Sequence, residues 1–302
     1  MQIAVVGSYG TGLTMRIDRM PEAGETLSGG VFASGPGGKG SNQAIGAARL
    51  GARVSLLTAL GPDAFAEEAR RLWAAEGVEA TVVTARAATM AGVILVEESG
   101  ENRIVIAPGA LDELRPEHVT AFAPAIAAAD LVLTCNEIPQ DVVSATLRTA
   151  REHGVRTLLN PAPARDLPAA DRPLVDYLTP NLGEARLLTG LGPAAGRDEL
   201  LDALRASFPA ATVVLTCGAD GAHADDGRSR FHLPAVRPSR VVDTTGAGDA
   251  FTAALATALH RPLPEAVRFA AAAGAYAVSR FEAIPGLGRT ADLEALLKGN
   301  LS

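Results

Sequence analysis

A glycine-rich turn that ends in an acid lies in the C-terminal third of the chain and could support phosphoryl transfer. Residues 243–249 read Asp-Thr-Thr-Gly-Ala-Gly-Asp, and an alanine-rich stretch with helical character, residues 250–259, follows directly. Glycine lets a backbone approach a ligand closely, and the free N–H groups at the start of a helix bind anions. Asp249 would repel a bound phosphate, but it could take the proton of an attacking hydroxyl. The alternative is a tight turn in which Asp249 only caps the helix.

A second glycine-rich segment, near the N-terminus, carries a lysine at the start of a predicted helix. Residues 35–44 read Gly-Pro-Gly-Gly-Lys-Gly-Ser-Asn-Gln-Ala. Neither the first nor the last position of a Walker A loop matches around Lys39. Gly10 and Gly12 begin a dinucleotide-binding fingerprint, but its third glycine is missing. Lys39 is therefore either a ligand-binding residue of another kind or an exposed surface charge.

Short apolar runs alternate with longer helical patterns, and these elements would position both segments. The predicted strands are residues 3–6, 54–59, 131–134, 157–159, 177–178 and 213–216. The predicted helices, besides residues 250–259, are residues 41–50, 64–76, 116–128, 140–153, 198–206 and 263–279. This alternation predicts an α/β fold with a doubly wound, mostly parallel sheet and helices on both faces, in a single domain of residues 1–302. Ligands of such sheets bind beyond the carboxyl ends of the strands.

Two segments interrupt the alternation and predict a small β-structured lid. The first, about residues 10–34, contains no clear helical pattern. The second, about residues 90–108, has the pattern of a hairpin with strands 91–97 and 103–107 and a polar turn at residues 99–102. The first strand of this hairpin would leave an exposed edge in a monomer. We therefore expect a homodimer that forms through the lid.

The bulk composition argues against several kinds of partner. The net charge is −7 and no basic cluster occurs, so nucleic acid is not an expected ligand. The apolar runs are too short to span a membrane, and the N-terminus has the pattern of a buried strand and not of a signal peptide. We expect a cytoplasmic protein without a membrane partner. Cys135 and Cys217 fit buried free thiols, and the histidines show no metal-ligand spacing.

Four segments resemble, in the right order, those of the ribokinase-like, or PfkB, carbohydrate kinases. Residues 243–251 resemble the family's C-terminal signature and residues 35–44 its N-terminal signature. Residues 160–165 and 179–184 resemble two intermediate segments, and the resemblance covers residues 3–297. It implies an enzyme that uses ATP and Mg²⁺ to transfer the γ-phosphoryl group to a primary hydroxyl of a sugar.

The resemblance also implies the residues of the phosphate half of the site. The catalytic group would be Asp249 as base, with an anion hole made by the N–H groups of Gly246, Ala247 and Gly248. The nucleotide-binding residues would be Asn181, Thr216, Gly218 and Gly221, with adenine near Ala273 and Ala277. Glu184 would hold Mg²⁺ through water, although Asn181 and Glu184 also fit a helix capping box, and both roles can hold at once.

A monovalent cation, K⁺, is a further implication of the resemblance. Asp243 and the carbonyl of Thr245 match the family's cation site. Glu282 stands where ribokinase-like sequences often have glycine, and a carboxylate there could alter or replace the cation.

The implied substrate-binding residues are Gly38, Lys39, Asn42, Glu137 and Asp249. Ribokinases carry an Asn-x-Asp pair after the first strand, but this chain has Gly10-Thr11-Gly12. The missing groups are those that a buried diol would need. Either a bulkier substrate or other donors, namely Thr11, Thr14 and Arg16, could fill the gap. Arg103 fits a solvated strand residue better than one that reaches over the site.

We therefore expect an ATP-dependent kinase for a pentose or related sugar, with ribose as the nearest example. The alternatives are a kinase for a nucleoside, ketohexose, sugar acid or sugar phosphate. A different class is a sugar-binding protein of the same fold without catalysis. The intact Asp249 and its glycine turn argue against that class.

Overall fold

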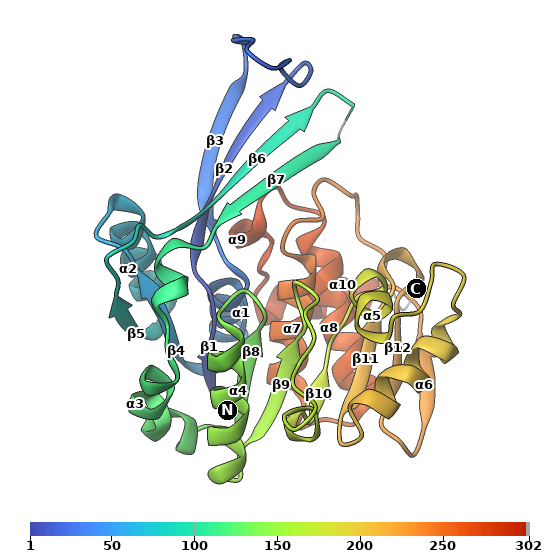
Figure 1. Ribbon diagram of the computed structural model, residues 1–302. Coiled ribbons are helices and arrows are strands. Elements are labelled where there is room, and N and C mark those ends of the chain that lie inside the picture. The colour runs from blue at the N-terminus through green and yellow to red at the C-terminus, as the bar shows by residue number, and fades with distance from the viewer. Residues whose placement is uncertain (100, 300–302) are drawn as a thin grey trace.

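The structure is a computed structural model that describes residues 1–99 and 101–299, and a nine-stranded sheet forms its centre (Figure 1). The strand order is β13-β12-β11-β10-β9-β8-β1-β4-β5. All strands from β11 to β5 in this order are parallel, whereas β12 and β13 add an antiparallel edge. The strands are β1 Gln2–Val6, β4 Arg53–Leu60, β5 Val78–Thr84, β8 Leu131–Cys135, β9 Arg156–Asn160, β10 Tyr177–Leu178, β11 Thr212–Thr216, β12 Ala222–Asp225 and β13 Arg230–Leu233.

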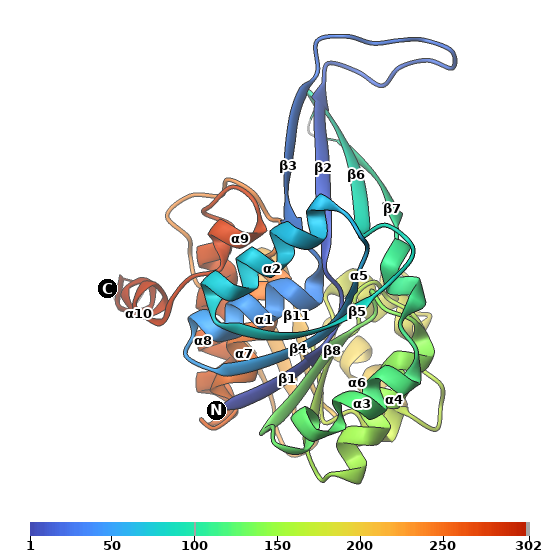
Figure 2. The same ribbon diagram turned by 90° about the vertical axis from the view of Figure 1, so that its left-hand side faces the viewer.

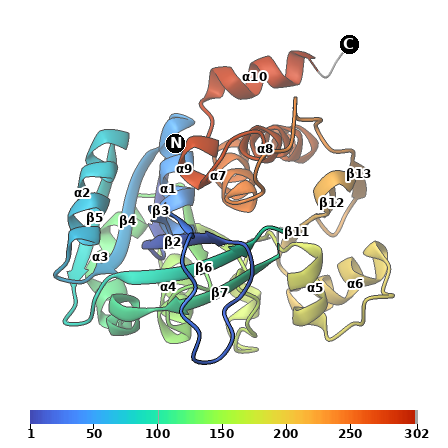
Figure 3. The same cartoon turned by 90° about the horizontal axis from the view of Figure 1, so that it is seen from above.

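Helices cover both faces of this sheet and enclose two separate cores (Figure 3). Successive side chains of a strand point to opposite faces, so Ile3 and Val5 of β1 enter one core while Ala4 and Val6 enter the other. The first core is closed by α1 Lys39–Arg49, α2 Ala64–Glu76, α7 Ala247–Ala258, α8 Leu263–Ala277 and α10 Thr290–Gly299. The second is closed by α3 Pro116–Ala127, α4 Gln140–Glu152, α5 Leu182–Thr189 and α6 Arg197–Ser207. The predicted doubly wound α/β fold is confirmed.

A four-stranded sheet, called the small sheet below, projects from the main body (Figures 1 and 2). Its order is β3-β2-β6-β7, with β2 Gly10–Ile17, β3 Val31–Gly37, β6 Met90–Glu97 and β7 Asn102–Ala107. Its strands come from the two segments that interrupt the βα alternation. The expected exposed edge at residues 91–97 is wrong, because β6 pairs with β2 on one side and β7 on the other. The edges are β3 and β7, and Gly100 of the predicted turn lies outside the described residues.

Some elements escaped prediction because their sequences are polar or short. β5 is an edge strand with several exposed side chains, so it lacks a continuous apolar run. The β12–β13 hairpin was missed because its charged and histidine side chains interrupt any apolar run. None of the described helices combines the length and apolar character that a bilayer span requires.

Candidate active site

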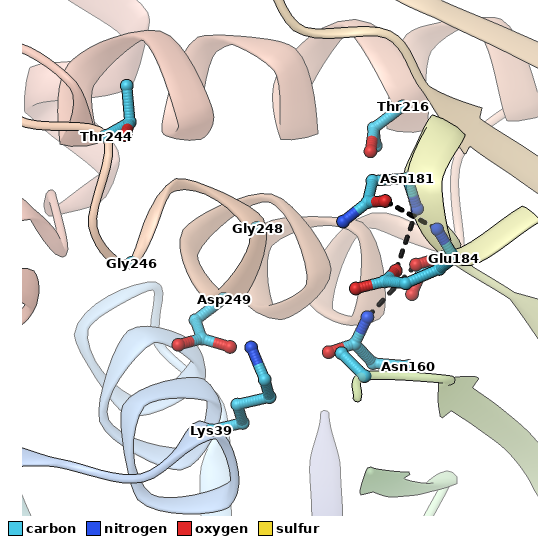
Figure 4. Close-up of a pocket in the computed structure, with 11 residues that line it drawn as sticks. Lys39, Asn160, Asn181, Glu184, Thr216, Thr244, Gly246, Gly248 and Asp249 are labelled. Carbon is cyan, nitrogen blue, oxygen red and sulfur yellow. Dashed lines mark hydrogen bonds between the residues drawn. The ribbon is translucent and has the colours of Figure 1, made fainter. Parts of the chain in front are cut away.

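The ends of five neighbouring parallel strands bring polar side chains to one edge of the main sheet. Ser8 follows β1, Glu137 follows β8, Asn160 ends β9, Asn181 follows β10 and Thr216 ends β11. These strands are adjacent in the sheet, so residues far apart in the sequence meet at its carboxyl edge. The start of α7 lies beside them, and Figure 4 shows its first turn next to the polar groups.

Asp249 lies in the first turn of α7 and is buried, with 6% of the residue exposed. Asn42 Nδ2 donates to one carboxylate oxygen at 2.9 Å and Gln43 Nε2 donates to the other at 3.0 Å. Burial raises the pKa of Asp249, and the charge of Lys39 and the two amide donors only partly offset this. The N-cap of α7 is Gly246, and within the described residues the donors to the Asp249 carboxylate come from α1, which argues against the capping alternative.

The turn before Asp249 needs glycine at its centre. Gly246 is the N-cap of α7 with φ 76°, and a Cβ there would lie 2.9 Å from Cβ of Ala283. Packing does not require glycine at position 248, because a Cβ there would meet nothing within 4 Å and would only fill open space. The N–H of Ala247 donates to the Thr244 carbonyl at 3.3 Å. Within the described residues, the N–H groups of Gly246 and Gly248 have no such partner and can bind an anion.

Lys39 begins α1 and is not the exposed surface charge that was the alternative. Its N-cap, Gly38, has φ 86°, and a Cβ on it would lie 2.6 Å from the backbone of Tyr9. Figure 4 shows the Lys39 amino group directed toward the Asp249 carboxylate. Burial lowers the pKa of Lys39, but the charges of Asp249 and Glu137 outweigh it and raise the pKa overall. Oε2 of Glu137 accepts hydrogen bonds from Ser8 Oγ at 2.6 Å and from the Lys39 N–H at 2.8 Å.

A small cavity of about 180 Å³ lies on one side of Asp249. Its polar lining is Lys39, Asn160, Thr179, Asn181, Glu184, Thr216, Thr244, Gly246, Gly248 and Asp249. Glu184 N–H donates to Asn181 Oδ1 at 2.8 Å, and Asn181 N–H donates to Glu184 Oε2 at 2.9 Å, so the expected capping box is present. Burial raises the pKa of Glu184. Its second carboxylate oxygen remains for a ligand, as a metal-bound water would require.

The cavity suits the phosphates of a nucleotide with a hydrated magnesium ion. Free N–H groups and an open space at Gly248 fit phosphate oxygens. Among the described residues no group of three or more His, Cys, Asp or Glu side chains could hold a metal ion. A Mg²⁺ ion here would therefore be held by Glu184, water and the phosphates themselves.

Other expected nucleotide residues lie outside this cavity. Gly218 begins a short turn after β11 with φ 57°, and Gly221 packs so closely that a Cβ would lie 2.1 Å from the Leu233 carbonyl oxygen. Ala273 and Ala277, near which adenine was expected, are buried in the first core, and the adenine site remains a prediction. Their apolar pattern arises from helix packing.

A larger cavity of about 710 Å³ lies on the other side of Asp249, under the small sheet. The expected substrate residues Gly38, Lys39, Asn42, Glu137 and Asp249 all line it. Arg103 does not, because it lies on the opposite face of the small sheet and pairs with Glu97 at 4.0 Å. The residue that does line the cavity is Arg16, whose guanidinium lies 5.2 Å from the ring centroid of Phe281.

Asp243 connects the glycine turn to the loop before α9 Ala283–Gly286. Its Oδ1 accepts from Thr245 N–H at 2.9 Å and Thr245 Oγ1 at 2.7 Å, and its Oδ2 accepts from Glu282 N–H at 3.0 Å. Burial acts to raise the pKa of Asp243, but these hydrogen bonds hold it below its usual value. Glu282 has φ 66°, and it alone among the described non-glycine residues has a positive φ. The K⁺ site remains a prediction.

Sequence reasoning missed Gln43 and Asn160 as parts of the site. Gln43 Nε2 bridges Asp249 and Asn160 Oδ1, the latter at 3.0 Å. Both residues lie inside segments that carried the family resemblance. Their position beside recognised residues was the available signal, but no side-chain pattern distinguishes a bridging amide from a core amide.

One cavity suits phosphates, the other is lined by carboxylates, and a single buried acid lies between them. In a doubly wound fold this arrangement is typical of a small-molecule kinase. The chain matches the pfkB family of carbohydrate kinases over residues 2–288. It is 35% identical to a ribokinase of Lactococcus lactis, with 98% of this chain and 97% of that protein covered. It is 36% identical to a deoxyribokinase of Salmonella typhimurium, with 83% of each chain covered.

Solved structures agree with this match. The Arabidopsis thaliana ribokinase complexed with ribose and ATP superposes with a TM-score of 0.90 at 28% identity, covering 98% of both chains. The chain belongs to the pfkB family and is an ATP-dependent carbohydrate kinase.

Proposed function

We propose that this kinase transfers the γ-phosphoryl group of ATP to a primary hydroxyl of a pentose or related sugar, with ribose as the nearest example. The observation that carries the proposal is that Asp249 lines both cavities, as do Lys39 and Gly246. A phosphate in the small cavity and a hydroxyl in the large one would therefore meet at this carboxylate. The ribokinase and deoxyribokinase relatives support a pentose as acceptor.

The chemistry follows from the residues at this junction. Asp249 takes the proton of the acceptor hydroxyl as the hydroxyl oxygen attacks the γ-phosphorus, and its raised pKa brings it closer to the strength a general base needs. The free N–H groups of Gly246 and Gly248 stabilise the charge that gathers on the phosphoryl oxygens. Asn42 and Gln43 hold the carboxylate in place through their amides. Mg²⁺, held near Glu184, neutralises phosphate charge when it is bound with ATP.

In this proposal Thr216 and Gly218 contact the phosphate tail of ATP, and Asn181 contacts it beside Glu184. Asp243 and the Thr245 carbonyl serve a monovalent cation, K⁺, next to the anion hole. In this proposal the enzyme acts in the cytoplasm.

The small sheet acts in this proposal as a lid and as a dimer interface. Its inner face lines the large cavity, so closure would exclude water and protect ATP from hydrolysis. Its outer face carries exposed apolar side chains, and Phe32, Val93 and Val105 there are 59%, 44% and 72% exposed. A second copy of the chain would bury this face. Light scattering at micromolar protein should give a dimer, and a monomer would contradict this part of the proposal.

The substrate is tested by ADP release with a panel of acceptors. Ribose and deoxyribose should be phosphorylated well, and nucleosides, ketohexoses, sugar acids and sugar phosphates poorly. Ribose turnover no better than background would refute a ribokinase activity. A protein that binds ribose but shows no turnover with any acceptor would be a sugar-binding protein instead.

One observation favours the alternative that the acceptor is a nucleoside. A Cβ on Gly12, Gly37 or Gly92 of the small sheet would meet its nearest atoms at 3.6, 3.7 and 3.9 Å, so packing does not demand glycine there. The inner face therefore has room for an acceptor larger than a pentose. Nucleoside turnover above ribose turnover would favour this alternative.

A further inference from the structure

The inner face of the small sheet contributes few hydrogen-bonding groups to the acceptor cavity. Gly12 of β2 pairs with Gly35 of β3 and Gly92 of β6, so three neighbouring positions of this face carry no side chain. Ile94 and Ile106, next to them on the same face, are apolar. Among the described side chains of this face, Thr14 and Arg16 also line the cavity, but hydroxyl groups of an acceptor above the three glycines would lack partners, which costs binding free energy.

One carboxylate reaches this bare surface from another element. Both oxygens of Glu282 approach Gly35, because a Cβ on Gly35 would lie 3.5 Å from Oε2 and 3.8 Å from Oε1. Glu282 lines the same cavity as Asp249. Within the described residues its carboxylate accepts no hydrogen bond and forms no ion pair, whereas both oxygens of the neighbouring Asp243 are occupied.

The backbone of Glu282 is held in a conformation that its residue type disfavours. With φ 66° and ψ 162° it lies in a region that is occupied almost only by glycine. Its N–H donates to Asp243 Oδ2, which anchors this conformation. Strain of this kind persists where the surrounding structure enforces it, and it clusters at ligand sites. Glycine would relieve the strain but would remove the carboxylate.

We propose that Glu282 determines acceptor specificity by accepting hydrogen bonds from hydroxyl groups of a neutral sugar, in place of side chains on the inner face of the small sheet. An ionised carboxylate only accepts hydrogen bonds, and sugar hydroxyls are donors. When the small sheet closes, the carboxylate loses water, and the acceptor replaces it. This inference rests on the proposed sugar kinase function.

The test compares Glu282→Gln and Glu282→Gly with the wild type in the ADP-release assay. The first substitution keeps the shape and the backbone strain but removes the charge, and the KM for the best acceptor should rise about ten- to hundredfold. The KM for ATP and the Tm should not change. The second should show the same loss for the acceptor, with a Tm higher by about 2 °C or more because the strain is relieved.

Two controls separate this role from others. Glu97→Gln changes a carboxylate on the outer face of the small sheet, so it should leave the acceptor KM unchanged. Gly12→Asp in the Glu282→Gly background returns a carboxylate to the same region from β2. A Cβ at Gly12 meets no atom closer than 3.6 Å, so the residue fits, and the acceptor KM should partly recover.

Three results would overturn the inference. The first is an acceptor KM within about threefold of wild type in Glu282→Gln. The second is a lower Tm with equal losses for ATP and acceptor, since this would mean a structural role. The third is a change only in the KCl concentration for half-maximal activity, since the carboxylate would then serve the cation. If the wild type phosphorylates no acceptor, the proposed function falls together with the inference.

Discussion

Substitution of Asp249 by asparagine separates the chemistry from the fold, because the surroundings of this residue can accept an amide. Asn42 and Gln43 each donate an amide N–H to the carboxylate, so a new amide group would place one donor against another. The side-chain oxygens of Asn42 and Gln43 are buried without a hydrogen-bond partner. Rotation of the Asn42 amide by half a turn would present its oxygen to the new N–H and restore the pair.

The expected cost in stability is therefore small, within about 1 kcal/mol, since one hydrogen bond replaces another. The buried charge also disappears, which offsets part of that cost because burial raises the pKa of Asp249. Activity should behave differently. A general base contributes about 10²–10⁴ to the rate, so kcat should fall by that factor while the KM values for ATP and sugar stay close to wild type.

The assay is steady-state ADP release with the best acceptor, together with thermal unfolding of the same preparations. Asn42→Ala is the matched control, because it removes one donor but leaves the base. It should lower kcat by much less than Asp249→Asn. Turnover of Asp249→Asn within about tenfold of wild type, at an unchanged Tm, would show that Asp249 is not the base.

Three further predictions test the remaining parts of the site. Gly246→Ala forces a side chain into φ 76° and against Ala283, so it should destabilise the protein by about 1–3 kcal/mol and lower kcat, as thermal unfolding and ADP release would show; an unchanged Tm would contradict the geometry. Glu184→Gln should raise the Mg²⁺ concentration for half-maximal activity about tenfold without changing the acceptor KM, and an unchanged Mg²⁺ titration would remove Glu184 from the metal site. The pKa of Asp249 is raised above the ordinary aspartate value of 3.8, so the base becomes protonated and inactive at a higher pH than an ordinary aspartate would. The acid limb of kcat/KM against pH should therefore lie above 3.8, and a limb at or below 3.8 would contradict this.

The pH dependence of stability has a sign that follows from the same burial. The folded protein holds the Asp249 proton more tightly than the unfolded chain does, because its pKa is raised on folding. Between the unfolded and folded pKa values the folded state therefore binds more protons, and this residue lowers stability as pH rises through that window. The pKa of Asp243 is lowered on folding, so this residue stabilises the folded protein above its unfolded pKa. That stabilisation is lost as pH falls through its folded pKa.

Two parts of the phosphate half of the site could be predicted from sequence because each of them is local. The turn at residues 243–249 carries both the acid and the glycines that shape the N–H groups around it. Asn181 and Glu184 are three residues apart, as a capping box requires. Residues that are close together in the sequence determine such short-range geometry, and the same arrangement recurs at helix termini in many proteins.

The expected substrate residues do line the acceptor cavity, but the glycine surface of the small sheet and the approach of Glu282 could not be predicted, because these parts come from distant elements. Gly12 and Gly35 become neighbours only through the pairing of β2 with β3, and Glu282 reaches them from the loop before α9. Arg103 illustrates the same limit. Strand residues alternate between faces, and the register alone decides whether this side chain faces the cavity or the outer surface.

The charges of the large cavity limit the acceptor further. It contains four carboxylates and two cationic groups, which are Asp249, Glu137, Asp243, Glu282, Lys39 and Arg16. Asp249 and Glu137 both act on Lys39, so its charge is already compensated. An acceptor with a phosphate or carboxylate would meet a net negative cavity in which Lys39 and Arg16 are the only cations among the described lining residues, and both act on carboxylates of the cavity. Like charges in a site of low dielectric repel strongly, so the electrostatics favour a neutral, hydroxyl-rich acceptor over a sugar acid or sugar phosphate.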